Sequence, residues 1–253
     1  MTTGNRLRAV MVVAALIPLS GCCFLGIGDC DNCQNNPAGP SCPQPQPIGQ
    51  RTLPISPTFQ QTVVWCWAAS AEMVFRYYGL PNLNPGGNYQ CGIVGAWFSN
   101  SACVFNCGLC PNPIGPMSNE LAVIRGYGPF ANTFGFPSRV LSASLIFRAL
   151  SAAEIKNEID AGRPVVVGIA PGGGFALPNA SQHIAVLVGY EFTASSQTVI
   201  VNDPFPFNFA PYSQIAHPYL SRGAQQLQQG QYRVALSDLV AFLGWANSIY
   251  QIQ

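Results

Sequence analysis

A cysteine stands at the point where an apolar segment of the chain gives way to a helical pattern. The residues from Ala68 onward are mostly good helix formers, and Gly79 ends the run. Cys66 is therefore expected at a helix N-terminus, where free backbone N–H groups and the helix dipole favour the thiolate over the thiol. The thiolate is the form that attacks carbonyl carbons, so the sequence predicts a cysteine nucleophile, with Gln60 six residues upstream.

Such a nucleophile needs a base, and the chain contains only two histidines. His183 opens a run of mainly β-branched and aliphatic residues, 184–190, which predicts a buried strand. His217 instead precedes Pro218 in a loop-like context. We therefore expect His183 to be the base, because a strand would hold its imidazole on a rigid element.

A third polar group follows the next predicted strand, residues 198–201. That strand ends in Asn202-Asp203-Pro204, and the proline stops the strand pairing. If the two strands are neighbours, either Asn202 or Asp203 reaches the far nitrogen of His183. Such a group fixes the tautomer of the imidazole and stabilises the imidazolium.

The order of these residues resembles that of the papain-like cysteine peptidases, over about Gln60 to Pro204. The segment Trp65-Cys66-Trp67-Ala68-Ala69-Ser70 is especially similar to the bacterial branch that contains plant-pathogen effector proteases. More loosely, the chain resembles the leader peptidases of bacteriocin exporters, which share the Asp203-Pro204 pair. The signature of the plant and lysosomal enzymes is missing, because Val63-Val64-Trp65 precedes the cysteine.

The resemblance implies a fold and a set of site residues. The fold would be α+β, with a helical half that carries the nucleophile and an antiparallel β half that carries the histidine and the aspartate. Cys66 and His183 would form a thiolate–imidazolium pair oriented by Asp203. The Gln60 side chain and the Cys66 backbone N–H would form an oxyanion hole. Gln61 competes with Gln60 for this role, and the six-residue spacing favours Gln60.

The amino terminus predicts export. Arg6 and Arg8 precede an apolar run at 9–18 that is too short to span a bilayer, which is typical of a signal peptide covering residues 1–21. Leu19-Ser20-Gly21-Cys22 resembles the bacterial lipobox, in which cleavage exposes a cysteine that is then acylated. Lipidation of Cys22 would anchor the protein in the bacterial cell envelope, outside the cytoplasm. The alternative is an ordinary secretory signal.

A tether rich in Gly, Pro, Asn and Gln is predicted at 22–57, followed by the catalytic domain at 58–253. Without Cys22 and Cys66, eight of the ten cysteines remain, in two sets of four: Cys23, Cys30, Cys33 and Cys42 in the tether, and Cys91, Cys103, Cys107 and Cys110 in the domain. Export favours two disulfides in each set, with the pairing left open. The second set lies in a predicted insert at 86–116, and a zinc site is the alternative there.

The rest of the chain predicts further elements of an α+β domain. Ser151 and Glu154 form a capping box that opens a helix. The other predicted elements are a short helix at 118–125, strands at 140–147, 164–170 and 232–236, the last of them final, and a glycine loop at 172–174 that forms a mobile lip.

Composition limits the possible partners. Charged residues make up only 8% of the chain and the net charge is +1, which argues against nucleic-acid binding. Scarce Asp and Glu argue against a calcium or dinuclear metal site, so no cofactor is expected. We predict a monomeric peptidase acting on proteins or peptides. The alternatives are acyl transfer or deamidation by the same residues, a catalytically silent peptide-binding module, and a structural lipoprotein.

Overall fold

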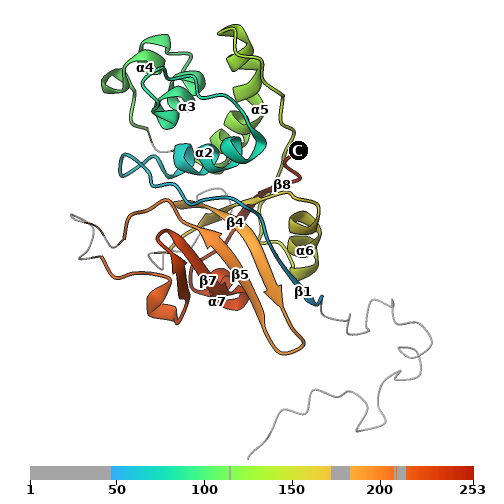
Figure 1. Cartoon of the computed structure of the whole chain (residues 1–253). Helices are drawn as coiled ribbons and strands as arrows, with labels where there is room; N and C mark the ends of the chain where they lie inside the picture. Colours follow the sequence, from blue (N-terminus) through green and yellow to red (C-terminus); the bar gives the residue numbers. More distant parts are fainter. Residues whose placement is uncertain (1–46, 114, 172–182, 208, 210–214) are drawn as a thin grey trace, which may run out of the picture. The chain divides into compact units, whose positions relative to one another are not determined.

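A computed structural model describes residues 47–113, 115–171, 183–207, 209 and 215–253 (Figure 1). The predicted signal peptide, the lipidation residue Cys22, the four tether cysteines and the glycine loop at 172–174 lie outside the described residues. Among the described residues, no helix combines the length and the apolar character that a membrane span requires.

Antiparallel pairing joins all the strands of the described residues into one eight-stranded sheet. Its order is β2-β8-β3-β4-β5-β7-β6, and β1 also pairs with β4 (Figure 1). The strands are β1 (Gly49–Thr52), β2 (Ser144–Ile146), β3 (Val165–Ile169), β4 (His183–Phe192), β5 (Gln197–Asn202), β6 (Gln225–Gln228), β7 (Gln231–Ala235) and β8 (Asn247–Tyr250).

The centre of the sheet confirms the strongest strand predictions. β3, β4 and β5 are neighbours, and nearly all of their residues are buried, as their runs of Val, Ile and Leu predict. The register between β4 and β5 shifts between Leu187 and Gly189, and a Cβ at Gly189 would lie 2.8 Å from the Arg51 carbonyl. The glycine therefore allows β1 to approach β4 closely.

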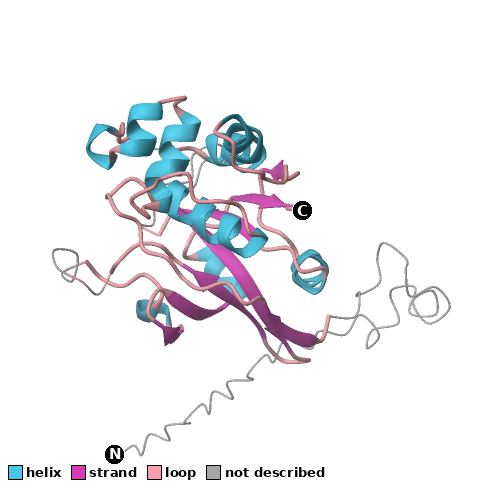
Figure 2. Cartoon of the chain, turned by 45° about the horizontal axis from the view of Figure 1, so that its top comes forward, coloured by secondary structure: helices cyan, strands magenta, loops and turns pink. Residues whose placement is uncertain are grey.

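The helices between Cys66 and Thr133 gather on one side of the sheet, while the two later helices pack elsewhere along it (Figures 1 and 2). The helix that begins at the predicted nucleophile crosses β4, and it ends at Gly79, which is left-handed with φ 71°. The helices are α2 (Cys66–Tyr78), α3 (Tyr89–Trp97), α4 (Ser101–Phe105), α5 (Met117–Thr133), α6 (Ala152–Asp160) and α7 (Leu236–Ala241), with short 3₁₀ helices η1 (Cys107–Leu109) and η3 (Leu220–Arg222). The predicted α+β fold, with a helical half and an antiparallel β half, is confirmed.

Several predicted boundaries were wrong. The helix expected at 118–125 continues to Thr133 as α5, through Pro129. Inside this helix, Gly128 leaves room for the Arg139 carbonyl, which would lie 2.1 Å from a Cβ at that position. The strand expected at 140–147 shrinks to β2, and the strand expected last is followed by β8. The capped helix is confirmed as α6, in which Ser151 and Glu154 bond reciprocally.

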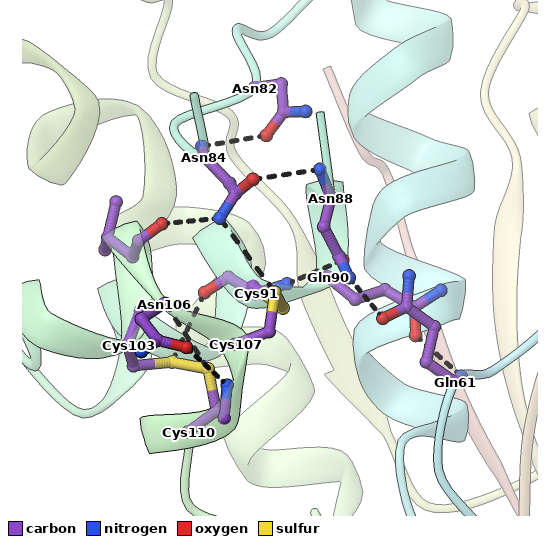
Figure 3. The surroundings of a disulfide bond; sticks show 12 residues. Gln61, Asn82, Asn84, Asn88, Gln90, Cys91, Cys103, Asn106, Cys107 and Cys110 are labelled. Atoms are coloured by element: carbon purple, nitrogen blue, oxygen red, sulfur yellow. Dashed lines mark hydrogen bonds between the residues drawn. A yellow bond between two sulfur atoms is a disulfide. The ribbon is translucent and has the colours of Figure 1, made fainter. Parts of the chain in front are cut away.

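The cysteine-rich insert is more helical than its Gly, Asn and Pro content predicts. Asn88 caps α3 and Asn100 caps α4, each accepting a backbone N–H with its side chain. Two disulfides, Cys91–Cys107 and Cys103–Cys110, join these elements to η1 (Figure 3). The disulfides take up the thiols of the alternative zinc site. Among the described residues, no group of three or more His, Cys, Asp or Glu side chains is arranged to hold a metal.

The sheet begins inside the range predicted for the tether. β1 pairs with the last four residues of β4, from Gly49 opposite Phe192 to Thr52 opposite Gly189. Leu53 and Ile55 follow β1 and are buried in the core. Residues from Gly49 onward therefore belong to the folded domain rather than to a free tether.

Candidate active site

Cys66 lies at the first position of α2 and borders a pocket. Its side chain is not in a disulfide and is partly exposed, whereas Trp65 and Trp67 on either side are buried. Trp67 donates its indole N–H to the Pro113 carbonyl (3.4 Å). Because both neighbours are held in the core, the direction of the thiol is fixed.

Ser70 ties α2 to the strand that carries His183. Its hydroxyl donates to the carbonyl of Ile184, the second residue of β4 (3.2 Å). Ala68 is fully buried, and α2 packs against β4. The second half of the Trp-Cys-Trp-Ala-Ala-Ser motif therefore sets how far Cys66 lies from the start of β4.

His183 is the first residue of β4, and its ring is oriented by a carboxylate. Nε2 lies 2.7 Å from Oδ1 of Asp203, and only 9% of the histidine side chain is exposed. This contact leaves Nδ1 for the Cys66 side chain, which also interacts with the imidazole. Burial lowers the pKa of His183, but the charge and hydrogen bond of Asp203, with a smaller contribution from Cys66, outweigh burial and raise the pKa above its ordinary value.

Asp203 follows β5 directly and is fully buried. Besides its contact with His183, its Oδ1 accepts the backbone N–H of Phe205 (2.8 Å). Its Oδ2 accepts the hydroxyl hydrogen of Tyr219 (2.8 Å). Both carboxylate oxygens are occupied, so the group meets the imidazole in one orientation.

Asn202 and Asp203 remained alternatives in the sequence, and their contacts separate them. The Asn202 amide donates to the Ile55 carbonyl (2.8 Å) and accepts from the Gln231 amide (2.8 Å). Asn202 therefore joins three segments of the β half, while Asp203 contacts His183.

An aromatic cluster behind Asp203 was not predicted. Tyr219 stacks on Tyr232, with 4.6 Å between the ring centroids. Burial and the Asp203 charge raise the pKa of Tyr219 well above its ordinary value, so the hydroxyl stays a neutral donor. His217, the rival candidate base, belongs to this cluster: its Nε2 lies 2.9 Å from the Tyr232 hydroxyl, and burial lowers its pKa. No motif in the sequence marks Tyr219 in advance.

The two candidate oxyanion glutamines have different surroundings. Gln60 is 8% exposed, and its amide donates to the Thr62 carbonyl (2.8 Å). Its Oε1 is buried and has no hydrogen-bond partner among the described residues. Its backbone N–H donates to the Pro204 carbonyl (2.9 Å), which joins it to the segment after β5. The exposed Gln61 side chain instead accepts from the Asn88 amide (2.5 Å).

A pocket of about 270 Å³ opens beside Cys66 and His183. Its other lining residues are apolar: Val63, Val64, Pro171, Phe205, Phe207 and Ile215. Val63 is 56% exposed at its edge. The thiol and the imidazole therefore face an apolar recess that an apolar group of a ligand can fill.

Glu120, in the first turn of α5, is a buried acid that the sequence did not single out. It is completely buried, and neither carboxyl oxygen has a hydrogen-bond partner among the described residues. Burial, with a further contribution from the charge of Cys66, raises the pKa of Glu120 well above its ordinary value. The surroundings of Glu120 therefore favour its protonated, neutral form.

Replacing Glu120 with glutamine should make unfolding less pH-dependent. The folded state favours the protonated acid, so the unfolded state releases a proton first as the pH rises. The free energy of unfolding should therefore fall by about 1.4 kcal/mol per pH unit above about pH 4.3, until the raised pKa of Glu120 is reached. Glu120→Gln should lack this loss and be the more stable protein at neutral pH. Urea unfolding of both proteins across this range measures the difference.

Glu154→Gln is the matched control, and it should change the free energy of unfolding at neutral pH in the opposite direction. The hydrogen bond from Arg148 lowers the pKa of Glu154 to about 2, so Glu154 contributes stability above its ordinary pKa and loses it in acid. This control should be less stable than the wild type at neutral pH. Equal slopes for the wild type and Glu120→Gln between about pH 5 and pH 7 would mean that Glu120 is ionised in the folded protein.

Comparison with known proteins identifies the family. A model of the Peptidase_C39 like family matches residues 52–227. Among solved structures, the chain is similar to a double glycine motif protease from an AMS/PCAT transporter in complex with the leader peptide, at 15% identity and a TM-score of 0.39, covering 81% of this chain and 95% of that chain. It is also similar to digestive procathepsin L 3 of Tenebrio molitor larval midgut, at 14% identity and a TM-score of 0.44, covering 81% and 70%. No curated protein matches the chain. The match over most of the folded domain means that this chain belongs to the Peptidase_C39 like family and is a cysteine peptidase.

Proposed function

We propose that the chain hydrolyses peptide bonds with Cys66 as nucleophile, His183 as acid and base, and Asp203 as the group that orients His183. The observation that carries this proposal is the 2.7 Å contact between Asp203 and His183, whose imidazole also interacts with Cys66. The contact holds the imidazole by Nε2, so Nδ1 is the nitrogen available to the thiol. Gln60 and the Cys66 backbone N–H would donate to the developing oxyanion.

The reaction divides into two transfers. The Cys66 thiolate attacks the carbonyl carbon, the C–N bond breaks, and His183 gives its proton to the leaving amine. The product of this step is a thioester on Cys66. Water then attacks the thioester, His183 takes a proton from that water, and the carboxylic acid leaves as the thiolate is restored. The charge of Asp203 stabilises the imidazolium in both steps.

We propose that the protein acts in the bacterial cell envelope. The support for this location is the lipobox-like sequence at Cys22 and the two disulfides of the insert, since disulfides persist in oxidising compartments. The protein would act as a monomer on peptides or proteins outside the cytoplasm, anchored by an acyl chain.

Alkylation of the folded, non-reduced protein tests the proposed pair. Iodoacetamide should modify Cys66 at about pH 6, well below the value near 8.5 at which an ordinary cysteine ionises. The His183→Ala variant should lose this early labelling, and peptide mass spectrometry identifies the modified cysteine. Fluorescein-labelled casein and a peptide library then supply substrates, and the new amino termini mark the cleavage sites.

The opposite result would identify a different kind of protein. A folded protein whose Cys66 resists iodoacetamide up to about pH 8 has no activated thiolate. That outcome would leave a peptide-binding module with the fold of a peptidase. Labelling at low pH without cleavage of any peptide would instead point to acyl transfer, in which another nucleophile replaces water.

A further inference from the structure

One buried side chain bonds the backbone on both sides of Gln60. Gln90, in the first turn of α3, is 1% exposed. Its Oε1 accepts the backbone N–H of Gln61 (3.0 Å), and its Nε2 donates to the carbonyl of Phe59 (2.9 Å). A single amide therefore fixes the residue before Gln60 and the residue after it.

A carboxylate determines which way this amide faces. The Nε2 of Gln90 also donates to Oε2 of Glu72 (3.0 Å), and Glu72 accepts a further bond from Arg76 (2.7 Å). An ionised carboxylate only accepts, so the NH₂ end of the amide must face Glu72. The oxygen end then faces Gln61. Since Glu72 lies in α2, the same amide connects the helix of Cys66 to the Phe59–Gln61 segment.

The helix that carries Gln90 is itself fixed by the insert. Cys91, the next residue, is disulfide-bonded to Cys107, and Asn88 caps the helix by accepting the Cys91 backbone N–H (3.2 Å). Asn88 also donates to the Gln61 side chain (2.5 Å). Figure 3 shows Asn88 and Gln90 extending from this disulfide-linked helix toward Gln61. The disulfide-linked insert therefore fixes the helix whose side chains Asn88 and Gln90 contact the Phe59–Gln61 segment.

We propose that Gln90 is a positioning residue for the peptidase reaction, which sets the place of Gln60 and through it the oxyanion hole. This inference rests on the proposed role of Gln60. Loss of one oxyanion donor lowers the rate by about 10²–10³, and a misplacement of about 1 Å can cost a similar factor. Loosening both flanks of Gln60 should therefore reduce kcat by about 10- to 100-fold, with KM changed by less than about twofold.

Two rates measured on Gln90→Met separate this role from a general loss of structure. Methionine has a similar shape to glutamine but makes none of the three hydrogen bonds. Peptide turnover needs the oxyanion hole, whereas alkylation of Cys66 by iodoacetamide develops no oxyanion. We expect Gln90→Met to lose turnover and to keep the alkylation rate within about twofold. Gln253→Met makes the same change at the exposed C-terminal residue and should retain full activity.

A double variant tests whether Gln90 acts through Gln60. Once Gln60→Ala has removed the oxyanion donor, adding Gln90→Met should not lower kcat any further. Glu72→Gln is the second route if Gln90→Met does not fold, because it weakens one of the three bonds that hold the Gln90 amide and should lower kcat more mildly. Two results would overturn the proposal. One is an unchanged kcat in both Gln90→Met and Glu72→Gln. The other is that Gln90→Met lowers kcat by the same factor in the wild type and in the Gln60→Ala variant. If Gln60→Ala is as active as wild type, the oxyanion role of Gln60 fails, and the role of Gln90 fails with it.

Discussion

Peptide hydrolysis should fall by about 10⁴- to 10⁶-fold when Cys66 is replaced by alanine. The variant keeps the fold, because Cys66 is only partly buried and its two tryptophan neighbours hold the start of α2. It loses the atom that forms the thioester, so the remaining donors have no covalent step to assist. Mass spectrometry of the cleavage products over long incubations can follow a loss of this size.

Ser195→Ala, in the exposed turn between β4 and β5, is the matched control and should remain fully active. Both variants pass through the same purification, so a contaminating enzyme would contribute equally to both, and a difference in cleavage between them comes from the loss of the thiol. Cleavage at the wild-type rate by a purified Cys66→Ala protein would exclude Cys66 as the nucleophile and with it the proposed mechanism.

Replacing Asp203 with asparagine should lower kcat on the order of 10³- to 10⁴-fold. Asparagine occupies the same volume, but it carries no charge to stabilise the imidazolium. Because Asp203 raises the pKa of His183, the pKa should fall in the variant. The imidazolium then loses its proton at a lower pH. The basic side of the pH–rate profile of turnover should move to lower pH, and the alkylation of Cys66 at low pH, which depends on the imidazolium partner, should be weakened.

Asp238→Asn makes the same chemical change in the first turn of α7, and it should leave both profiles in place. Tyr219→Phe is an intermediate case, since it removes one of the hydrogen bonds to Asp203 and keeps the charge. We expect it to lower kcat by about tenfold. An Asp203→Asn protein with the wild-type pH profile would show that the carboxylate does not control the proton on His183.

Some candidate residues of the site could be chosen from the sequence because the residues next to them mark them. Cys66 stands out because a helix pattern begins there, and His183 because the chain has only one other histidine, which precedes a proline. The choice between Asn202 and Asp203 as the group that orients His183 stayed open, because both stand at the end of the same strand. Only the register of β5 against β4 brings Asp203 to the imidazole and turns Asn202 toward Ile55.

The parts of the site that were missed depend on contacts between distant segments. Gln90 acts on Phe59 and Gln61 from another helix, and Tyr219 reaches Asp203 from a segment without a motif. Nothing near Glu120 in the sequence marks it as buried. The insert contains the two disulfides that its cysteines predict, while the helix caps Asn88 and Asn100 were not predicted.

The position of β4 also determines how the site comes apart. β3 and β1 pair in succession along one edge of this strand, and β5 pairs along the other. Amides enclosed in this way should be among the slowest to exchange with solvent, and His183 begins this strand. Cys66 is the first residue of α2, but its neighbours Trp65 and Trp67 are buried and Ser70 bonds to Ile184 of β4. The thiol should therefore separate from the imidazole only when α2 leaves β4, so the geometry of the candidate site should be lost together with the fold of the domain.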